Sequence, residues 1–130
     1  MKLFANVNSD AKIIIGDNTR IHGSCIHAKK RIQIGKNCLI AGNCQIFDCN
    51  AHPISMDDPQ NRKDLKAEPK PVIIEDNVWI TANCIILPGV IIGEGSVVGA
   101  GSVVNQDIPP RSLVMGNPVQ IIKTWEEEKK

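Results

Sequence analysis

Aromatic side chains are scarce in this sequence. They make up 3% of its 130 residues, with two Phe, two Trp and no Tyr. Globular cores usually draw much of their buried area from aromatic rings. The core of this chain must therefore be filled by Ile, Val and small residues, and β-branched residues favour strands.

The sequence also lacks an excess of charge and a long apolar run. Its 15 Lys+Arg stand against 14 Asp+Glu, and no basic stripe of the kind that binds nucleic acid is present. No apolar run approaches the roughly 18 residues that a membrane span needs. The first residues lack the apolar stretch of a signal peptide. We expect one cytoplasmic domain over residues 1–130, with no nucleic-acid partner.

Metal-binding or redox cysteine motifs are missing too. The spacings of the five cysteines match no CxxC pattern, and an odd number fits reduced thiols of a cytoplasmic protein. We therefore expect no metal cofactor. Cys38, Cys44 and Cys84 occupy small-residue positions of a repeat, where a free Cys acts as a small hydrophobe.

What the sequence does contain is a six-residue repeat. Every sixth residue from Ile74 is aliphatic: Ile74, Ile80, Ile86, Ile92, Val98 and Val104. The residues two positions earlier are small or β-branched: Val72, Val78, Cys84, Val90, Ser96 and Ser102. Asn, Asp and Gly gather between these short segments, as in tight turns. The N-terminal half repeats the pattern less regularly, and its register slips near residues 28–31.

A period of six predicts one short strand and one turn per hexad. Three hexads close a triangular coil, and coils stack through parallel hydrogen-bond ladders. The aliphatic residues then stack 18 positions apart, Ile74 on Ile92, Ile80 on Val98 and Ile86 on Val104. The sequence predicts an all-β parallel β-helix of about four to five coils, a solenoid in which each coil contacts its neighbours. An antiparallel sandwich, with turns every 8–12 residues, does not fit this period. Periodicity does not give the hand of the helix.

The repeat fails after Ile46 and resumes at Val72. The intervening segment 53–71 is polar and contains four prolines, so we predict a long surface loop, which in compact domains is often functional. Residues 1–12 are expected to form an N-terminal cap. Residues 120–130 are expected to form a short solvated helix or tail.

His52 occupies the position where the repeat calls for an aliphatic residue. Such violations concentrate at functional sites. If the chain stays extended there, Asp48, Asn50 and His52 point to one face, where a carboxylate and an amide can orient the imidazole and tune its pKa. These three residues are our candidate catalytic group. A histidine at a loop entry with no chemical role remains the alternative.

Residues from about 34 to 123 resemble the hexapeptide-repeat acyltransferases, closest to the maltose, galactoside and polysaccharide O-acetyltransferases. The strings that carry the resemblance are Asn-Ala-His-Pro at 50–53 and the segments 71–80, 86–93, 98–110 and 116–119. The resemblance implies a left-handed β-helix, a homotrimer with active sites between subunits, and acetyl-coenzyme A as co-substrate. The implied reaction is acetyl transfer to a hydroxyl of a sugar or of a polysaccharide or lipopolysaccharide precursor.

The resemblance also implies roles for individual residues. His52 would be the general base that takes a proton from the acceptor hydroxyl, which attacks the thioester directly. The amide of Ala82 would stabilise the oxyanion, and Asn77 would contact the substrate. Trp79 would flank the acceptor or the pantetheine arm, or would instead only seal the trimer interface. The implied coenzyme contacts are Ala82, Ala100, Asn105, Gln106, Asn117, Pro118 and Lys123.

This chain departs from the family pattern at positions that bind coenzyme phosphates. It has Asn105 and Gln106 where relatives often carry Thr-Lys, and Gln120 where they often carry a basic residue. We therefore expect the coenzyme to be anchored differently, with Lys123 and Arg111 as available cations.

Two other functions fit parts of the sequence. A γ-type carbonic anhydrase-like zinc enzyme would use three histidines, and this chain has His22, His27 and His52. In those enzymes, however, the close pair follows the lone histidine, whereas here it precedes it. The other alternative is a non-catalytic β-helix that acts as a scaffold or binding protein, which the departures at 105, 106 and 120 would favour.

Overall fold

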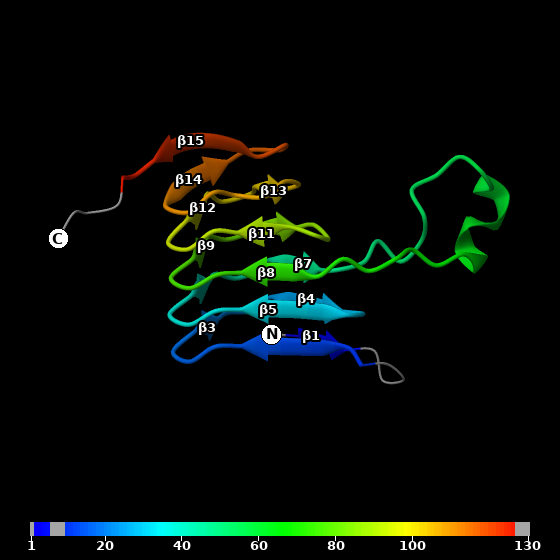
Figure 1. The fold of residues 1–130 in the computed structure, drawn as a ribbon, viewed down its shortest axis with the longest axis horizontal. Helices are drawn as coiled ribbons and strands as arrows, with labels where there is room; N and C mark the ends of the chain where they lie inside the picture. The colour runs from blue at the N-terminus through cyan, green and yellow to red at the C-terminus, as the bar shows by residue number, and fades with distance from the viewer. Residues whose placement is uncertain (1, 6–9, 127–130) are drawn as a thin grey trace.

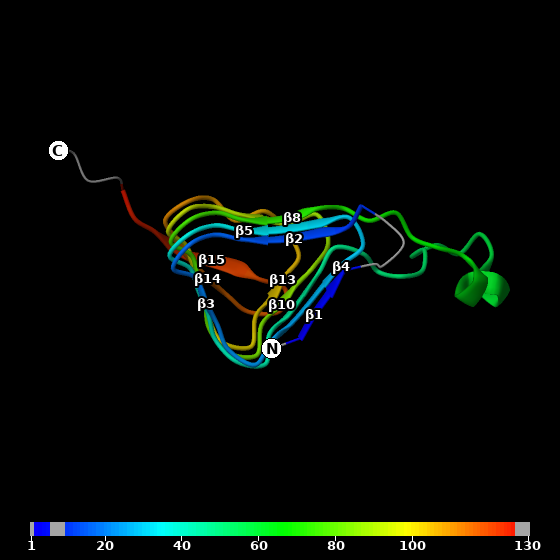
Figure 2. The same ribbon diagram turned by 90° about the horizontal axis from the view of Figure 1, so that it is seen from below.

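The structure is a computed structural model that describes residues 2–5 and 10–126. In that part of the chain, fifteen short strands and one 3-10 helix, η1 (Pro59–Asp64), are present. The strands wind into a triangular prism with one sheet on each face, seen from the side in Figure 1 and in cross-section in Figure 2. The described strand pairs are parallel except the last, β14 with β15. The predicted parallel β-helix is confirmed.

Each sheet collects every third strand along most of the chain. Sheet A contains β1 (Lys2–Ala5), β4 (Cys25–Ala28), β7 (Gln45–Phe47), β10 (Ile85–Ile86) and β13 (Val103–Val104). Sheet B contains β2 (Lys12–Ile15), β5 (Arg31–Ile34), β8 (Val72–Ile74) and β11 (Ile91–Ile92). Sheet C contains β3 (Arg20–Ile21), β6 (Leu39–Ile40), β9 (Trp79–Ile80), β12 (Val97–Val98), β14 (Ser112–Met115) and β15 (Gln120–Thr124). Partial coils at both ends extend the predicted complete coils to about six turns.

The chain winds to the left. In Figure 1, β2, β5 and β8 run from right to left on the near face, and the coils rise from β1 to β15. Figure 2 views the prism from below, so the chain recedes from the viewer while it turns counter-clockwise through β2, β3 and β4. The left hand implied by the family resemblance is therefore observed, against the usual right-handed crossover between parallel strands.

The core consists of the residues that the hexads select. Strand β8 shows the alternation, because Val72 and Ile74 are buried while Ile73 between them points outward. The predicted stacking is also observed: Ile74 pairs with Ile92, Ile80 with Val98 and Ile86 with Val104. Cys38, Cys44 and Cys84 are fully buried free thiols, as expected of small core residues.

The edges of the prism depend on residues that accept a left-handed backbone. Asn18, Asn37 and Asn77 have φ near +60° at the edge between sheets B and C, and Asn43 and Asn83 have similar values at the edge between sheets C and A. Asn tolerates this conformation better than most residues. At the second edge, the Asn43 side chain donates a hydrogen bond to Asn83 Oδ1 at 2.7 Å, which links successive coils.

Both ends of the chain differ in part from expectation. The predicted cap contains β1, which pairs with β4, while residues 1 and 6–9 lie outside the described residues. The prediction of a helix or tail after residue 120 is wrong for its first part. Gln120–Thr124 forms β15, which pairs antiparallel with β14 and covers the open edge of sheet C. Residues 127–130 lie outside the described residues.

Candidate functional site

A long loop leaves the prism between β7 and β8 and projects well beyond it (Figure 1). It includes the predicted segment 53–71 but begins earlier, because β7 ends at Phe47. The residue that follows, Asp48, is completely buried. Its carboxylate accepts hydrogen bonds from the backbone N–H groups of Lys29, Lys30 and Arg31, each at 2.8 Å. Asp48 therefore fixes the base of the loop to the corner of the coil below it.

The two limbs of the loop are tied together near this base. The Lys70 N–H donates to the Asp48 carbonyl at 2.7 Å, and the Ala67 N–H donates to the Ala51 carbonyl at 3.2 Å. Ala51 has φ +67°, and the His52 N–H donates to the Asn50 carbonyl at 2.7 Å. The chain is thus turned rather than extended at this point. The condition under which Asp48, Asn50 and His52 would share one face is not met.

His52 has an exposed side chain with a defined orientation. Its Nδ1 lies 2.9 Å from the carbonyl oxygen of Leu65, on the returning limb. A carbonyl oxygen only accepts hydrogen bonds, so Nδ1 must carry the proton. In the neutral ring this assigns the lone pair to Nε2. The loop therefore holds His52 in the tautomer that presents a base.

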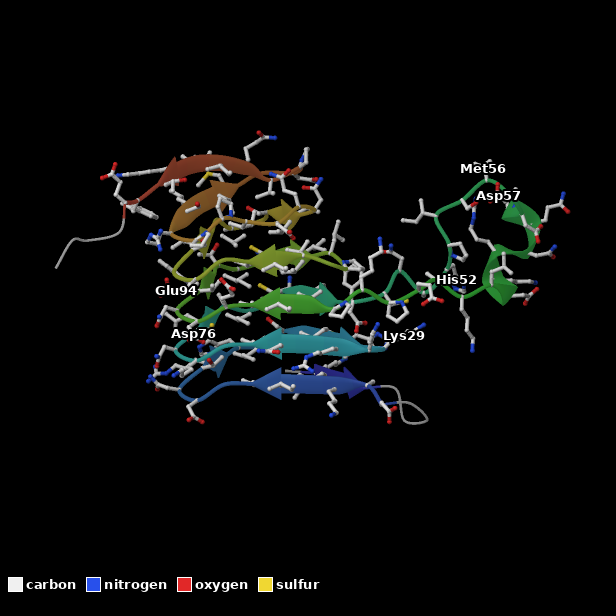
Figure 3. The ribbon with its side chains drawn as sticks, in the orientation of Figure 1. Lys29, His52, Met56, Asp57, Asp76 and Glu94 are labelled. Carbon is white, nitrogen blue, oxygen red and sulfur yellow. The ribbon has the colours of Figure 1, made fainter. Side chains whose placement is uncertain are left out.

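His52 lines a pocket of about 580 Å³ in the concave side of the loop. The other lining residues are Asn50, Arg62 and the segment 53–56. Figure 3 shows His52 away from the prism, where the loop widens into its outer lobe, with Met56 and Asp57 farther along the same lobe. The structure thus brings the predicted residues His52 and Asn50 to one pocket, while the carboxylate of Asp48 is bonded elsewhere. The proposed catalytic part of Asp48 stays a prediction.

Ala82 and Ala100 lie at equivalent positions of successive coils, at the edge between sheets C and A. Strand pairing places them in register, since Ile85 pairs with Val103. Within the described residues, neither backbone N–H donates a hydrogen bond. Two stacked and unpaired N–H groups are what a ligand with carbonyl or amide oxygens could engage. The coenzyme and oxyanion roles expected for these residues stay a prediction.

Trp79 and Asn77 lie on a different side of the prism from His52. Trp79 is 47% exposed on the outer face of sheet C, between Leu39 and Val97. The Asn77 side chain donates to Glu94 Oε1 at 3.1 Å. Figure 3 shows that Glu94 occupies the edge of the prism opposite the loop. One copy of the chain therefore does not bring these two predicted substrate residues to His52.

The remaining coenzyme candidates are exposed near the C-terminal coils. Asn105 and Gln106 lie at the edge from which the loop projects, after β13. Asn117 and Pro118 precede β15 and are joined by a cis peptide bond. Within β15, Lys123 Nζ lies 5.3 Å from the centroid of the Trp125 ring.

Sequence reasoning missed two contributors to the pocket, the Leu65 carbonyl and Arg62. A backbone carbonyl leaves no signal in a sequence. Arg62 is the only arginine in the segment 53–71, which the sequence predicts to be a loop, and this signal was available.

The described residues contain no group of three His, Cys, Asp or Glu side chains arranged to hold a metal ion. None of the helices in the described ranges is long and apolar enough to cross a membrane.

A left-handed β-helix built from six-residue repeats, with one projecting loop that carries a histidine, places the chain in the class of hexapeptide-repeat proteins. Comparison with known sequences gives the same result. Residues 71–106 match the family described as bacterial transferase hexapeptide (six repeats). The chain belongs to this hexapeptide-repeat transferase family.

Several named relatives are acetyltransferases. The chain is 43% identical over 100 residues to the 2,3,4,5-tetrahydropyridine-2,6-dicarboxylate N-acetyltransferase of Halalkalibacterium halodurans, covering 77% of this chain and 36% of the relative. A hexapeptide-repeat acetyltransferase of Vibrio cholerae, solved with acetyl-coenzyme A, matches with a TM-score of 0.83 and 36% identity, over 96% of this chain and 66% of that one.

A maltose O-acetyltransferase of Clostridium difficile also matches with a TM-score of 0.83, at 38% identity, over 97% of this chain and 65% of that one. The chain spans about half the length of the curated relatives that it matches.

Proposed function

We propose that this protein is an acetyl-coenzyme A-dependent O-acetyltransferase that acts on a hydroxyl of a sugar or of a polysaccharide or lipopolysaccharide precursor. The observation that carries the proposal is the contact between His52 Nδ1 and the Leu65 carbonyl, because it leaves Nε2 as a base in a pocket. The solved acetyltransferase with acetyl-coenzyme A and the maltose O-acetyltransferase support the donor and the type of acceptor.

The proposed reaction is a single transfer step. His52 Nε2 takes the proton from the acceptor hydroxyl as its oxygen forms a bond to the acetyl carbonyl carbon. The carbon–sulfur bond of the thioester breaks, and the proton then passes to the coenzyme sulfur. The unpaired N–H of Ala82 would donate to the developing oxyanion, and the N–H of Ala100 would contact the coenzyme arm. No covalent enzyme intermediate and no metal are required.

The active form in this proposal is a homotrimer with sites between subunits. His52 and the substrate candidates Trp79 and Asn77 lie on different sides of one chain, so they can meet only when two copies pack together. The outer face of sheet C offers an apolar surface for such packing, with Leu39 and Trp79 each 47% exposed in adjacent coils. Exposed apolar patches of this kind mark interaction sites.

The free thiols support a reducing, cytoplasmic location.

The test is His52→Ala in a coenzyme A release assay with acetyl-coenzyme A and a panel of sugars. Removing a general base lowers the rate by about 10²–10⁴, while the thermal midpoint and the assembly state stay unchanged. His22→Ala, a change at another exposed histidine, is the matched control and should keep full activity. Full activity in His52→Ala would refute the proposed base.

A complementation experiment tests the shared site. His52→Ala and Trp79→Ala chains are co-expressed and compared with each variant alone. If one copy supplies His52 and its neighbour supplies Trp79, mixed assemblies contain some intact sites and recover activity. A monomer by light scattering, or the absence of recovery in mixed assemblies, would contradict the inter-subunit site.

An amine acceptor is the second candidate, because one relative is named as an N-acetyltransferase. The same panel separates the two reactions when each sugar is offered beside its amino analogue. A non-catalytic scaffold predicts no release of coenzyme A with any acceptor.

A further inference from the structure

Arg62 is the one side chain with a permanent positive charge among the residues that line the His52 pocket. It lies in η1, and its Nη2 donates to the Ser55 carbonyl at 2.7 Å and approaches Met56 Sδ at 3.5 Å. These contacts hold the guanidinium against residues 55 and 56 of the same loop. Much of the side-chain freedom that an arginine loses on binding a ligand is therefore already lost.

The hydrogen-bonding capacity of Arg62 is far from satisfied. A guanidinium has five N–H donors, but contacts within the described residues involve only Nη2. Its Nε is buried without an acceptor, and Nη1 donates to none of the described residues. A buried donor without an acceptor destabilises the folded protein, so the protein tolerates an unfavourable arrangement at this point.

Carboxylates are close in sequence but do not pair with Arg62. Asp57, Asp58 and Asp64 surround it, yet no carboxylate of the described residues lies within ion-pair distance of its guanidinium. Asp58 instead accepts hydrogen bonds from the Asn61 side chain at 3.0 and 3.2 Å. The loop thus keeps a positioned cation without a counter-charge beside the proposed base.

From this arrangement we propose that Arg62 binds an anionic group, a carboxylate or a phosphate, on the acceptor, so that the substrate class is acidic sugars. A guanidinium is suited to both groups because its N–H donors lie in a plane that matches their oxygens. The inference rests on the proposed function, since it assigns the acceptor to the His52 pocket. None of the other residues that line this pocket in the described part of the chain carries a permanent positive charge, so Arg62 is the fixed cation that an anion would meet there.

A purely structural role for Arg62, closing the loop through Ser55, makes a different prediction. Loss of that contact would loosen the pocket for every acceptor, whether charged or neutral. Loss of an anion contact would affect charged acceptors alone. The preference between matched ligands therefore separates the two roles.

The experiment measures binding of methyl glucuronide, glucose 6-phosphate and methyl glucoside by calorimetry to wild type, Arg62→Gln and Arg62→Lys. We expect wild type to bind one of the two anionic sugars better than methyl glucoside, and the comparison between them identifies the anion. Arg62→Gln should weaken that binding by about 10- to 100-fold, the range for a hydrogen bond to a charged group. Arg62→Lys keeps the charge without the planar donors and should lose less. Methyl glucoside binding should stay the same in all three proteins.

Lys63→Gln is the matched control, because it removes the same charge from the next residue, which is exposed and does not line the pocket. Equal losses for charged and neutral sugars in Arg62→Gln, or no preference for either anion in wild type, would overturn the inference. If the protein binds an anionic sugar preferentially through Arg62 but transfers no acetyl group, only the proposed reaction is refuted and the inference about Arg62 stands.

Discussion

The burial of Asp48 allows a structural role to be separated from a catalytic one. Its carboxylate is fully buried and accepts three backbone N–H groups at 2.8 Å, two of them on Oδ2 and one on Oδ1. We predict that Asp48→Asn and Asp48→Ala destabilise the protein in graded steps. An asparagine amide that keeps its oxygen at the Oδ2 position still accepts two of these bonds, but its NH₂ group then faces the third donor.

The expected losses follow from that count. One N–H without an acceptor, together with weaker bonds to a neutral oxygen, costs about 2 kcal/mol in Asp48→Asn. Three N–H groups without acceptors cost about 3–5 kcal/mol in Asp48→Ala, because water can reach part of this corner. The assay is urea unfolding followed by circular dichroism, with acetyl transfer measured on the same samples below the unfolding transition. Asp64→Asn, the same change at an exposed loop position, should unfold like wild type.

The reasoning fails if Asp48→Asn unfolds like wild type and yet has a strongly reduced kcat. Such a result would return Asp48 to the catalytic group predicted from the sequence. If stability falls as expected while kcat per folded molecule is nearly retained, Asp48 acts by positioning the loop.

Two further predictions concern the prism. Gly35→Ala should destabilise the protein by at least about 1–3 kcal/mol, because an added Cβ would overlap Asp76 Oδ1 and lie 2.8 Å from the Asp76 backbone nitrogen. Gly42→Ala should be close to neutral, because its Cβ would meet nothing within 4 Å; urea unfolding of both variants measures the difference, and equal losses would contradict the prediction. Burial raises the pKa of the Cys38 thiol. The hydrogen bond between Cys84 and Cys44, together with burial, raises the pKa of the Cys84 thiol. Since only thiolates react, alkylation of the folded protein at neutral pH should spare Cys38 and Cys84, and mass spectrometry before and after denaturation measures this; rapid labelling of either residue in the folded state would refute it.

The scaffold was largely predictable because the buried positions of each six-residue repeat are occupied by aliphatic or small residues. Ile74, Ile80 and Ile86 each stack on the residue 18 positions later, as the pattern required. The hand was not available from the period and came only from resemblance to a family. The register slip near residues 28–31 has a structural counterpart, since Ile26 pairs with Ile46, a longer step than in the C-terminal coils.

The candidate site was less predictable, because it depends on polar contacts between segments. Hydrophobic periodicity predicted a core position for His52, but the chain leaves the prism after Phe47. It turns there because the buried carboxylate of Asp48 accepts hydrogen bonds from backbone N–H groups of the coil below. The strand at Gln120–Thr124 was overlooked although it contains β-branched residues. Its formation depends on the open edge of sheet C, which no local pattern reveals.

The insertion that carries His52 leaves the alignment of the prism intact. Across it, the partners are Ile46 with Ile86, Ile34 with Ile74 and Ile40 with Ile80, so all three faces resume together after the same step of 40 residues. The cost of closing a loop grows only slowly with its length, and the two limbs meet at a single edge. The insertion can therefore be lengthened, shortened or exchanged without disturbing the repeating framework, and under the proposed function such changes would alter the acceptor while the coils stay the same.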